Sequence, residues 1–168
     1  MAGAEQGWHM DIQKLAKFLV AAREKCSYET VGETGETSLP DGTKLIGPYT
    51  AGQLSYTDRY KGFEWFTGRE EITEGGKLVW ERKYEGGIVD DRFKERSLAL
   101  KLFDVLKLCL RQFPRNEPFK RGPNDLKING YEYRDLCEGD MTSFDGKEQV
   151  FYDGKEVHVF NYHGGLVR

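Results

Sequence analysis

Two aspartates occupy matched positions in this sequence and are its clearest candidates for acid–base chemistry. Asp58 and Asp135 each follow a tyrosine by two residues, Tyr56 and Tyr133. Two carboxylates within about 6 Å of each other would raise the pKa of one of them and could serve in hydrolysis. The alternative is that each carboxylate accepts local hydrogen bonds at a strand end or turn, a common role of Asp. We prefer the local role and assign no catalytic residue.

Two histidines near the C-terminus raise the question of a metal site or a Cys-His pair. His158 and His163, with Cys137 or Asp135, are the residues available for it. Histidines five residues apart on one strand point to opposite faces, which opposes a compact metal site. His158 also stands where the first half of the chain has Trp80, which favours packing. We therefore predict no metal and no cofactor.

An aromatic set with a few polar members is the best candidate for a ligand site. Aromatic walls with polar tips are typical of small-molecule pockets. The alternative is that these side chains form core or a dimer face, where Tyr and Trp are also enriched. The candidate ligand-binding residues are Tyr56, Trp65, Trp80, Arg82, Tyr84, Tyr133, His158, Phe160 and Tyr162.

The glycine-rich segment 31–52 could be taken for a phosphate-binding loop. It lacks the Gly-Lys-Ser/Thr ending of a P-loop and contains no Gly-x-Gly-x-x-Gly motif. We predict an ordinary loop with one short strand near residues 44–46. A loop of this length could cover a cavity.

Many of the candidate residues recur at a fixed offset. Residues 66–89 and 144–167 share ten identities over 24 positions at an offset of 78, including Gly68 with Gly146 and Tyr84 with Tyr162. Chance would give about one or two. Upstream, an offset of 77 pairs Asp58 with Asp135. The repetition predicts an internal duplication.

Each repeat contains a hairpin signal. Asp153-Gly154 is typical of a two-residue type I′ turn, and Gly75-Gly76 takes its place in the first half. A regular hairpin would set Val150 opposite Val157, with an aliphatic face under the helices and an aromatic face elsewhere.

Two amphipathic patterns predict helices over about 11–25, with Asp11 near its cap, and over about 91–113. Residues 1–10 show no periodicity and are predicted to be a flexible leader. The prediction is an α+β fold with a mainly antiparallel sheet and two principal helices. Two αβββ units, about 11–90 and 91–168, would form one domain, and the second helix could alternatively mediate a homodimer.

Composition excludes several classes of protein. The chain has 168 residues, 38% of them hydrophobic, and a net charge of −3 from interspersed signs, which favours a globular domain without direct nucleic-acid binding. Three cysteines lack a paired spacing, and no apolar run is long enough for a membrane span. We expect a cytoplasmic protein with no membrane contact.

The paired elements Y.D...G, F.G.E, GK.V and Y.GG, with W after the first GK.V, resemble an uncharacterised bacterial domain-of-unknown-function family. That family occurs alone or C-terminal to helix-turn-helix regulators of the xenobiotic-response-element type. The resemblance covers the chain from about residue 15 and implies effector sensing by analogy. Only one helix precedes the glycine-rich loop, so this chain has no helix-turn-helix for DNA.

Together these observations predict a non-catalytic domain that binds an unknown small molecule or senses one. The alternatives are a hydrolase that uses Asp58 and Asp135, and a protein-interaction module that dimerises.

Overall fold

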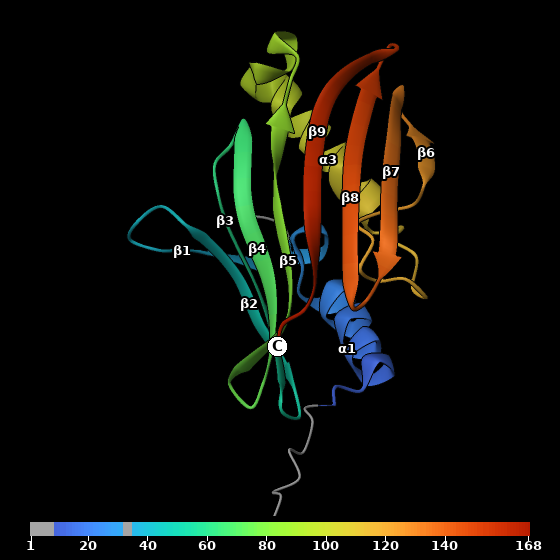
Figure 1. Ribbon diagram of the computed structural model, residues 1–168. Helices are drawn as coiled ribbons and strands as arrows, with labels where there is room; N and C mark the ends of the chain where they lie inside the picture. Colours follow the sequence, from blue (N-terminus) through green and yellow to red (C-terminus); the bar gives the residue numbers. More distant parts are fainter. Residues whose placement is uncertain (1–8, 32–34) are drawn as a thin grey trace, which may run out of the picture.

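The computed structural model describes residues 9–31 and 35–168 (Figure 1). The helices are α1 (Ile12–Lys25), α2 (Tyr28–Val31), the 3-10 helix η2 (Asp91–Lys94) and α3 (Arg96–Leu110). The strands are β1 (Glu36–Ser38), β2 (Lys44–Ala51), β3 (Leu54–Lys61), β4 (Trp65–Glu74), β5 (Lys77–Ile88), β6 (Asp125–Ile128), β7 (Tyr131–Asp140), β8 (Ser143–Tyr152) and β9 (Lys155–Leu166).

The nine strands of the described chain form one antiparallel sheet in the order β1-β2-β3-β4-β5-β9-β8-β7-β6. Consecutive strands pair through short turns, and the two runs of strands meet where β5 pairs with β9. In that central pair Tyr84 lies opposite Tyr162. The prediction of a mainly antiparallel sheet is confirmed, but each run holds more strands than the three expected.

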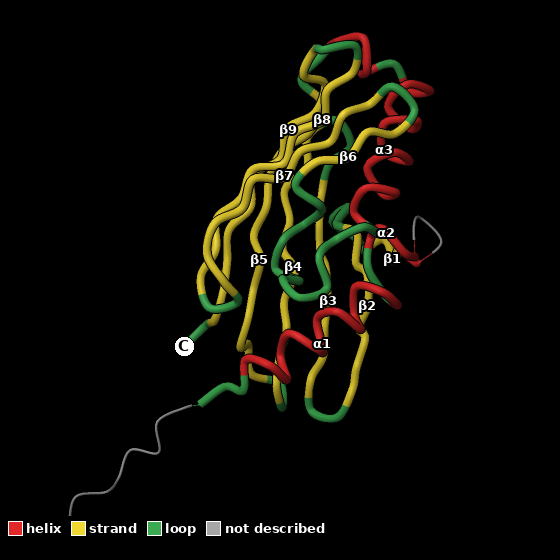
Figure 2. Tube along the Cα trace, turned by 90° about the vertical axis from the view of Figure 1, so that its right-hand side faces the viewer, coloured by secondary structure: helices red, strands yellow, loops and turns green. Residues whose placement is uncertain are grey.

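Both long helices cover the same face of the sheet, here called the inner face (Figure 2). Asp11 caps α1 by accepting a hydrogen bond from the Lys14 amide, and Glu95 caps α3. The two predicted helices are thus present, although the second is interrupted at Glu95. Among the described helices, none is long and apolar enough to cross a membrane.

The core beneath these helices divides into two clusters. Leu15 and Leu19 of α1 pack with the inner face of β3–β5, and Leu102 and Leu106 of α3 pack with β5 and β7–β9. The leader predicted for residues 1–10 lies outside the described residues except at its end, where Met10 is buried in the first cluster.

The predicted hairpin turns are present, but the predicted register is wrong. Asp153 and Gly154 have positive φ, as a type I′ turn requires, and Tyr152 lies opposite Lys155. A bulge then adds Val157, so Val150 lies opposite His158. A matching bulge at Val79 sets Ile72 opposite Trp80.

The bulges also correct the predicted faces of these strands. Each shifts its strand by one residue, which turns the aromatic series inward. Those side chains therefore lie beneath the helices, on the face where aliphatic residues were expected. The glycine-rich segment likewise differs from its prediction, because its residues 36–38 and 44–51 form β1 and β2.

Candidate functional site

Two tyrosine–aspartate pairs are buried on the inner face. The Tyr84 hydroxyl donates to Asp58 Oδ1 at 2.5 Å, and the Tyr162 hydroxyl donates to Asp135 Oδ1 at 2.8 Å. Each phenol lies over a glycine of the neighbouring strand: a Cβ on Gly68 would lie 2.5 Å from the Tyr84 oxygen, and one on Gly146 would lie 2.2 Å from the Tyr162 ring. The recurring tyrosines, aspartates and glycines are therefore parts of these two contacts.

The two phenols point away from each other, one over β4 and the other over β8. Strands β4, β5, β9 and β8 lie between the strands that carry Asp58 and Asp135. Five strand spacings of about 4.8 Å separate the two backbones along the sheet. The close carboxylate pair considered from the sequence does not form, so the structure does not support a hydrolase built on it.

Two glutamates lie beside these pairs, each with a tyrosine and an arginine. Glu70 accepts from the Tyr56 hydroxyl at 2.7 Å and forms an ion pair with Arg82 of β5. Glu148 accepts from the Tyr133 hydroxyl at 2.5 Å and from Arg121 Nε at 3.2 Å. Arg121 lies in the connection 111–124. At the position matching Arg82, β9 has a phenylalanine, so the adjacent strand does not supply the arginine for Glu148.

A third buried arginine holds that connection in place. Arg23 of α1 pairs with Glu29 at 3.1 Å and donates to the carbonyl oxygens of Pro118 and Arg121 at 3.0 and 2.6 Å. The position of Arg121 therefore depends on α1. The proline-rich connection, which has no regular hydrogen-bond pattern of its own, is fixed by side-chain bonds to its backbone.

Burial and neighbouring charge shift the pKa values of this cluster in opposite directions. Burial, with the charge of Glu70, raises the pKa of Asp58 well above its usual value, and burial beside Glu148 raises the pKa of Asp135 to about 6. Burial alone would raise the pKa of Glu70, but Arg82 outweighs it and lowers that pKa to about 2. The buried glutamates and arginines are equal in number, and the two aspartates bind their protons more tightly than aspartates in water do.

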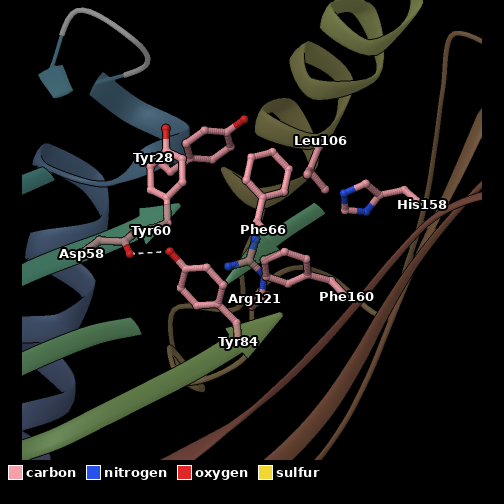
Figure 3. Close-up of a pocket in the computed structure, with 9 residues that line it drawn as sticks. All are labelled: Tyr28, Asp58, Tyr60, Phe66, Tyr84, Leu106, Arg121, His158 and Phe160. Atoms are coloured by element: carbon pink, nitrogen blue, oxygen red, sulfur yellow. Dashed lines mark hydrogen bonds between the residues drawn. The ribbon is translucent and has the colours of Figure 1, made fainter. Parts of the chain in front are cut away.

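A narrow cavity opens beside Asp58 and Tyr84 (Figure 3). Its volume is about 30 Å³, which is room for about two water molecules. Its walls are mostly aromatic, and polar atoms reach it from Asp58, Arg121 and His158. The lining residues are Tyr28, Asp58, Tyr60, Phe66, Tyr84, Leu106, Arg121, His158 and Phe160.

His158 is the least satisfied polar side chain in this region. It is fully buried, and neither ring nitrogen has a hydrogen-bond partner among the described residues. Burial and the charge of Arg121 lower its pKa to about 3, so the ring is neutral at pH 7. A neutral imidazole carries one donor and one acceptor; the described residues enclose both, so an occupant of the cavity would pair with them only after a movement of the ring or its neighbours.

A larger pocket adjoins the narrow cavity and shares Tyr28, Tyr60 and Phe66 with it. Its volume is about 400 Å³, within the range of small-molecule sites. It lies between β1–β4, α2 and α3, and it adds both apolar and charged walls. These further lining residues include Phe63, Phe103, Leu100, Lys44, Arg96, Lys107, Glu36 and Asp104.

The structure separates the nine candidate ligand-binding residues into three groups. Tyr84, His158 and Phe160 line the narrow cavity. Five others lie in the surrounding buried network and core: Tyr56, Trp80, Arg82, Tyr133 and Tyr162. Trp65 is 47% exposed at the start of β4 and lines neither cavity. His163 is exposed on the outer face.

Sequence reasoning missed Arg121 and Leu106, although both line the narrow cavity. Arg121 lies in an irregular proline-rich stretch, where no periodicity assigns a side chain to a face. Leu106 lies on an amphipathic helix, where an apolar side chain is expected to pack in the core. The one available signal was Glu148, which repeats Glu70 without a matching arginine on β9 and so requires a cation from elsewhere.

Comparison with known proteins agrees with the resemblance in part. No curated protein and no solved structure matches the chain. A family described as a domain of unknown function (DUF5680) matches residues 48–167, which span β3 to β9 and the second half of β2. These residues carry all of the buried network except Arg23 and Glu29, and the chain belongs to this family.

Proposed function

We propose that this chain binds a small organic molecule without changing it chemically, in the narrow cavity and the larger pocket next to it. The observation that carries the proposal is His158, whose two ring nitrogens are buried without a partner at the cavity wall. An unpaired buried polar group costs about 1–3 kcal/mol of stability. An occupant that pairs with these nitrogens recovers that free energy.

The shapes of the two cavities support a ligand with two parts. The narrow cavity admits only a small polar group, and the larger pocket accommodates a flat or apolar body against Tyr28, Tyr60 and Phe66. Aromatic walls with few polar contacts are typical of small-molecule sites. Binding without chemistry is favoured because Asp58 and Asp135 are held apart, each by its own tyrosine.

Thermal-shift screening against a metabolite library tests the proposal. A ligand present at a hundred times its Kd stabilises the folded state by about 2.7 kcal/mol. We expect His158→Phe to reduce the shift by at least half, because it keeps an aromatic ring but removes both nitrogens. Trp65→Ala is the matched control and should keep the full shift. The proposal fails if no compound raises the melting temperature, or if both variants respond like the parent.

Two further inferences concern origin and context. We infer an internal duplication, supported by the offset of 78 residues and by the matched tyrosine–aspartate pairs on the two sides of the β5–β9 contact. The resembled bacterial family includes domains attached to helix-turn-helix regulators. This supports the further proposal that the bound molecule is an effector, sensed in the cytoplasm. Duplication would be contradicted if close relatives kept the residues of one half and randomised those of the other.

A further inference from the structure

The three buried arginines differ in how much of each guanidinium is used. Arg82 donates from Nε and Nη2 to Glu70, and from Nη1 to the Phe119 carbonyl oxygen. Arg23 likewise donates from all three of its nitrogens. Arg121 donates only from Nε, to Glu148, and its two terminal nitrogens have no hydrogen bond to any described residue.

The unused nitrogens of Arg121 are accessible from the cavity. The described residues do not enclose these two nitrogens completely, so the nitrogens reach open space. The Arg121 guanidinium carbon lies 4.3 Å from the centre of the Phe160 ring, which holds the group by its face. Figure 3 shows the guanidinium between Phe66, Tyr84 and Phe160, with its nitrogens toward the middle of the site.

Other polar groups around the terminal nitrogens of Arg121 can also donate hydrogen bonds. A neutral His158 ring contributes one N–H, and the Asp58 carboxyl donates when it carries its proton. Two terminal nitrogens of one guanidinium form a planar fork that matches the two oxygens of a carboxylate. A site with such a fork, a neutral imidazole and aromatic walls fits a flat acid better than an amine.

We propose that the ligand is a carboxylic acid whose carboxylate enters the narrow cavity and binds the terminal nitrogens of Arg121, while its apolar body occupies the larger pocket. This proposal rests on the proposed function and specifies its ligand class. Arg121 then bridges two carboxylates: Glu148 through Nε, and the ligand through Nη1 and Nη2. Arg23 is a positioning residue, because it holds the carbonyl oxygen of Arg121.

Calorimetric titration with matched acids and amides tests the ligand class. The probes are acetate, benzoate and phenylacetate, each compared with acetamide, benzamide or phenylacetamide. We expect the acids to bind at least tenfold more tightly than the amides of the same shape. Arg121→Lys keeps a positive charge for Glu148 but loses the planar fork, so it should reduce this preference at least tenfold and leave amide affinity unchanged.

Two further variants make the outcome unambiguous. Arg59→Lys makes the same change on the outer face, where Arg59 is exposed, and should leave the preference unchanged. Glu148→Gln removes the competing carboxylate and should strengthen acid binding, which gives a second test if Arg121→Lys does not fold.

The possible failures distinguish the two proposals. Amides that bind as tightly as acids, or an acid preference that survives both Arg121→Lys and Glu148→Gln unchanged, would overturn the carboxylate proposal and leave ligand binding intact. If neither series binds and the metabolite library also gives no ligand, both proposals fall.

Discussion

The two halves of the sheet, β1–β5 and β6–β9, supply a cation to a buried glutamate in different ways. Glu70 receives Arg82 from the adjacent strand, and that guanidinium uses every nitrogen. Glu148 receives Arg121 from the connection above the sheet, through one nitrogen. The strand arginine completes a closed contact, whereas the loop arginine keeps a free edge beside a cavity. The two glutamates thus differ in how completely the hydrogen-bonding groups of their arginines are used.

Substituting the two arginines should change the free energy of unfolding most. Arg82→Met leaves Glu70 as a buried unpaired charge, and we expect it to lower the free energy of unfolding by about 3–5 kcal/mol. Arg121→Met likewise leaves Glu148 as a buried unpaired charge, but it removes one side-chain hydrogen bond where Arg82→Met removes three, so we expect a smaller loss. Urea denaturation measures both, with Arg82→Met/Glu70→Gln as a control that should recover part of the loss. Equal losses in the two single variants would contradict the difference drawn here.

The pH dependence of stability should differ between the two aspartates. Asp135 binds its proton more tightly when folded, with its pKa raised from 3.8 to about 6. The free energy of unfolding is therefore highest below pH 4 for this group and falls by about 3 kcal/mol as pH rises to 6. Asp135→Asn should abolish this fall in the free energy of unfolding between pH 4 and 6.

Asp58 should add to the decline as pH rises through its raised pKa, because burial and the charge of Glu70 favour its protonated form in the folded state. Urea denaturation of the parent and of Asp135→Asn between pH 4 and 8 checks both statements. A slope between pH 4 and 6 that survives in Asp135→Asn would disprove the assignment to Asp135.

Alanine at the two glycines beneath the tyrosines should destabilise each side by a different amount. A Cβ on Gly68 meets the Arg59 backbone oxygen as well as the Tyr84 phenol, both at 2.5 Å, whereas the nearest contacts of one on Gly146 are all with the Tyr162 side chain. We expect losses of about 1–3 kcal/mol, larger for Gly68→Ala because a backbone atom cannot rotate away. Thermal denaturation compares them with Thr67→Ala on the outer face, which should change little.

Removing the phenol hydroxyls should have the smallest effect of the four changes. Tyr162→Phe loses bonds to both Asp135 oxygens and the hydrogen bond from the Arg121 amide, whereas Tyr84→Phe loses one bond to Asp58. We expect about 1 kcal/mol for each, with the larger loss for Tyr162→Phe. Urea denaturation at pH 7 measures the difference, and a larger loss for Tyr84→Phe would reverse the ranking.

Local signals made part of this fold predictable from the sequence. Helix α1 follows from its apolar period and the cap at Asp11, and the Asp153-Gly154 turn follows from residues that tolerate positive φ. The recurring tyrosine, aspartate and glycine positions identified residues that do meet in space. Each of these features depends on neighbours within a few residues or on repetition of the sequence.

Other features depend on contacts between distant segments. Arg121 reaches Glu148 because Arg23 fixes its backbone, and no local pattern encodes that approach. Trp65 shares its residue type with Trp80 but lies at a strand end, where it is exposed. The hairpin register failed because a bulge adds one residue without changing the turn.

The bulge at Val157 decides which of the two alternating sets of β9 side chains faces the interior. In phase with the turn alone, β9 would present Val159, Asn161 and His163 to the core. The extra residue shifts the alternation by half a period, which brings His158, Phe160 and Tyr162 inside instead. One inserted residue beside Val157 would bring Val159, Asn161 and His163 inside, so a single codon decides which of the two sets of side chains the interior receives.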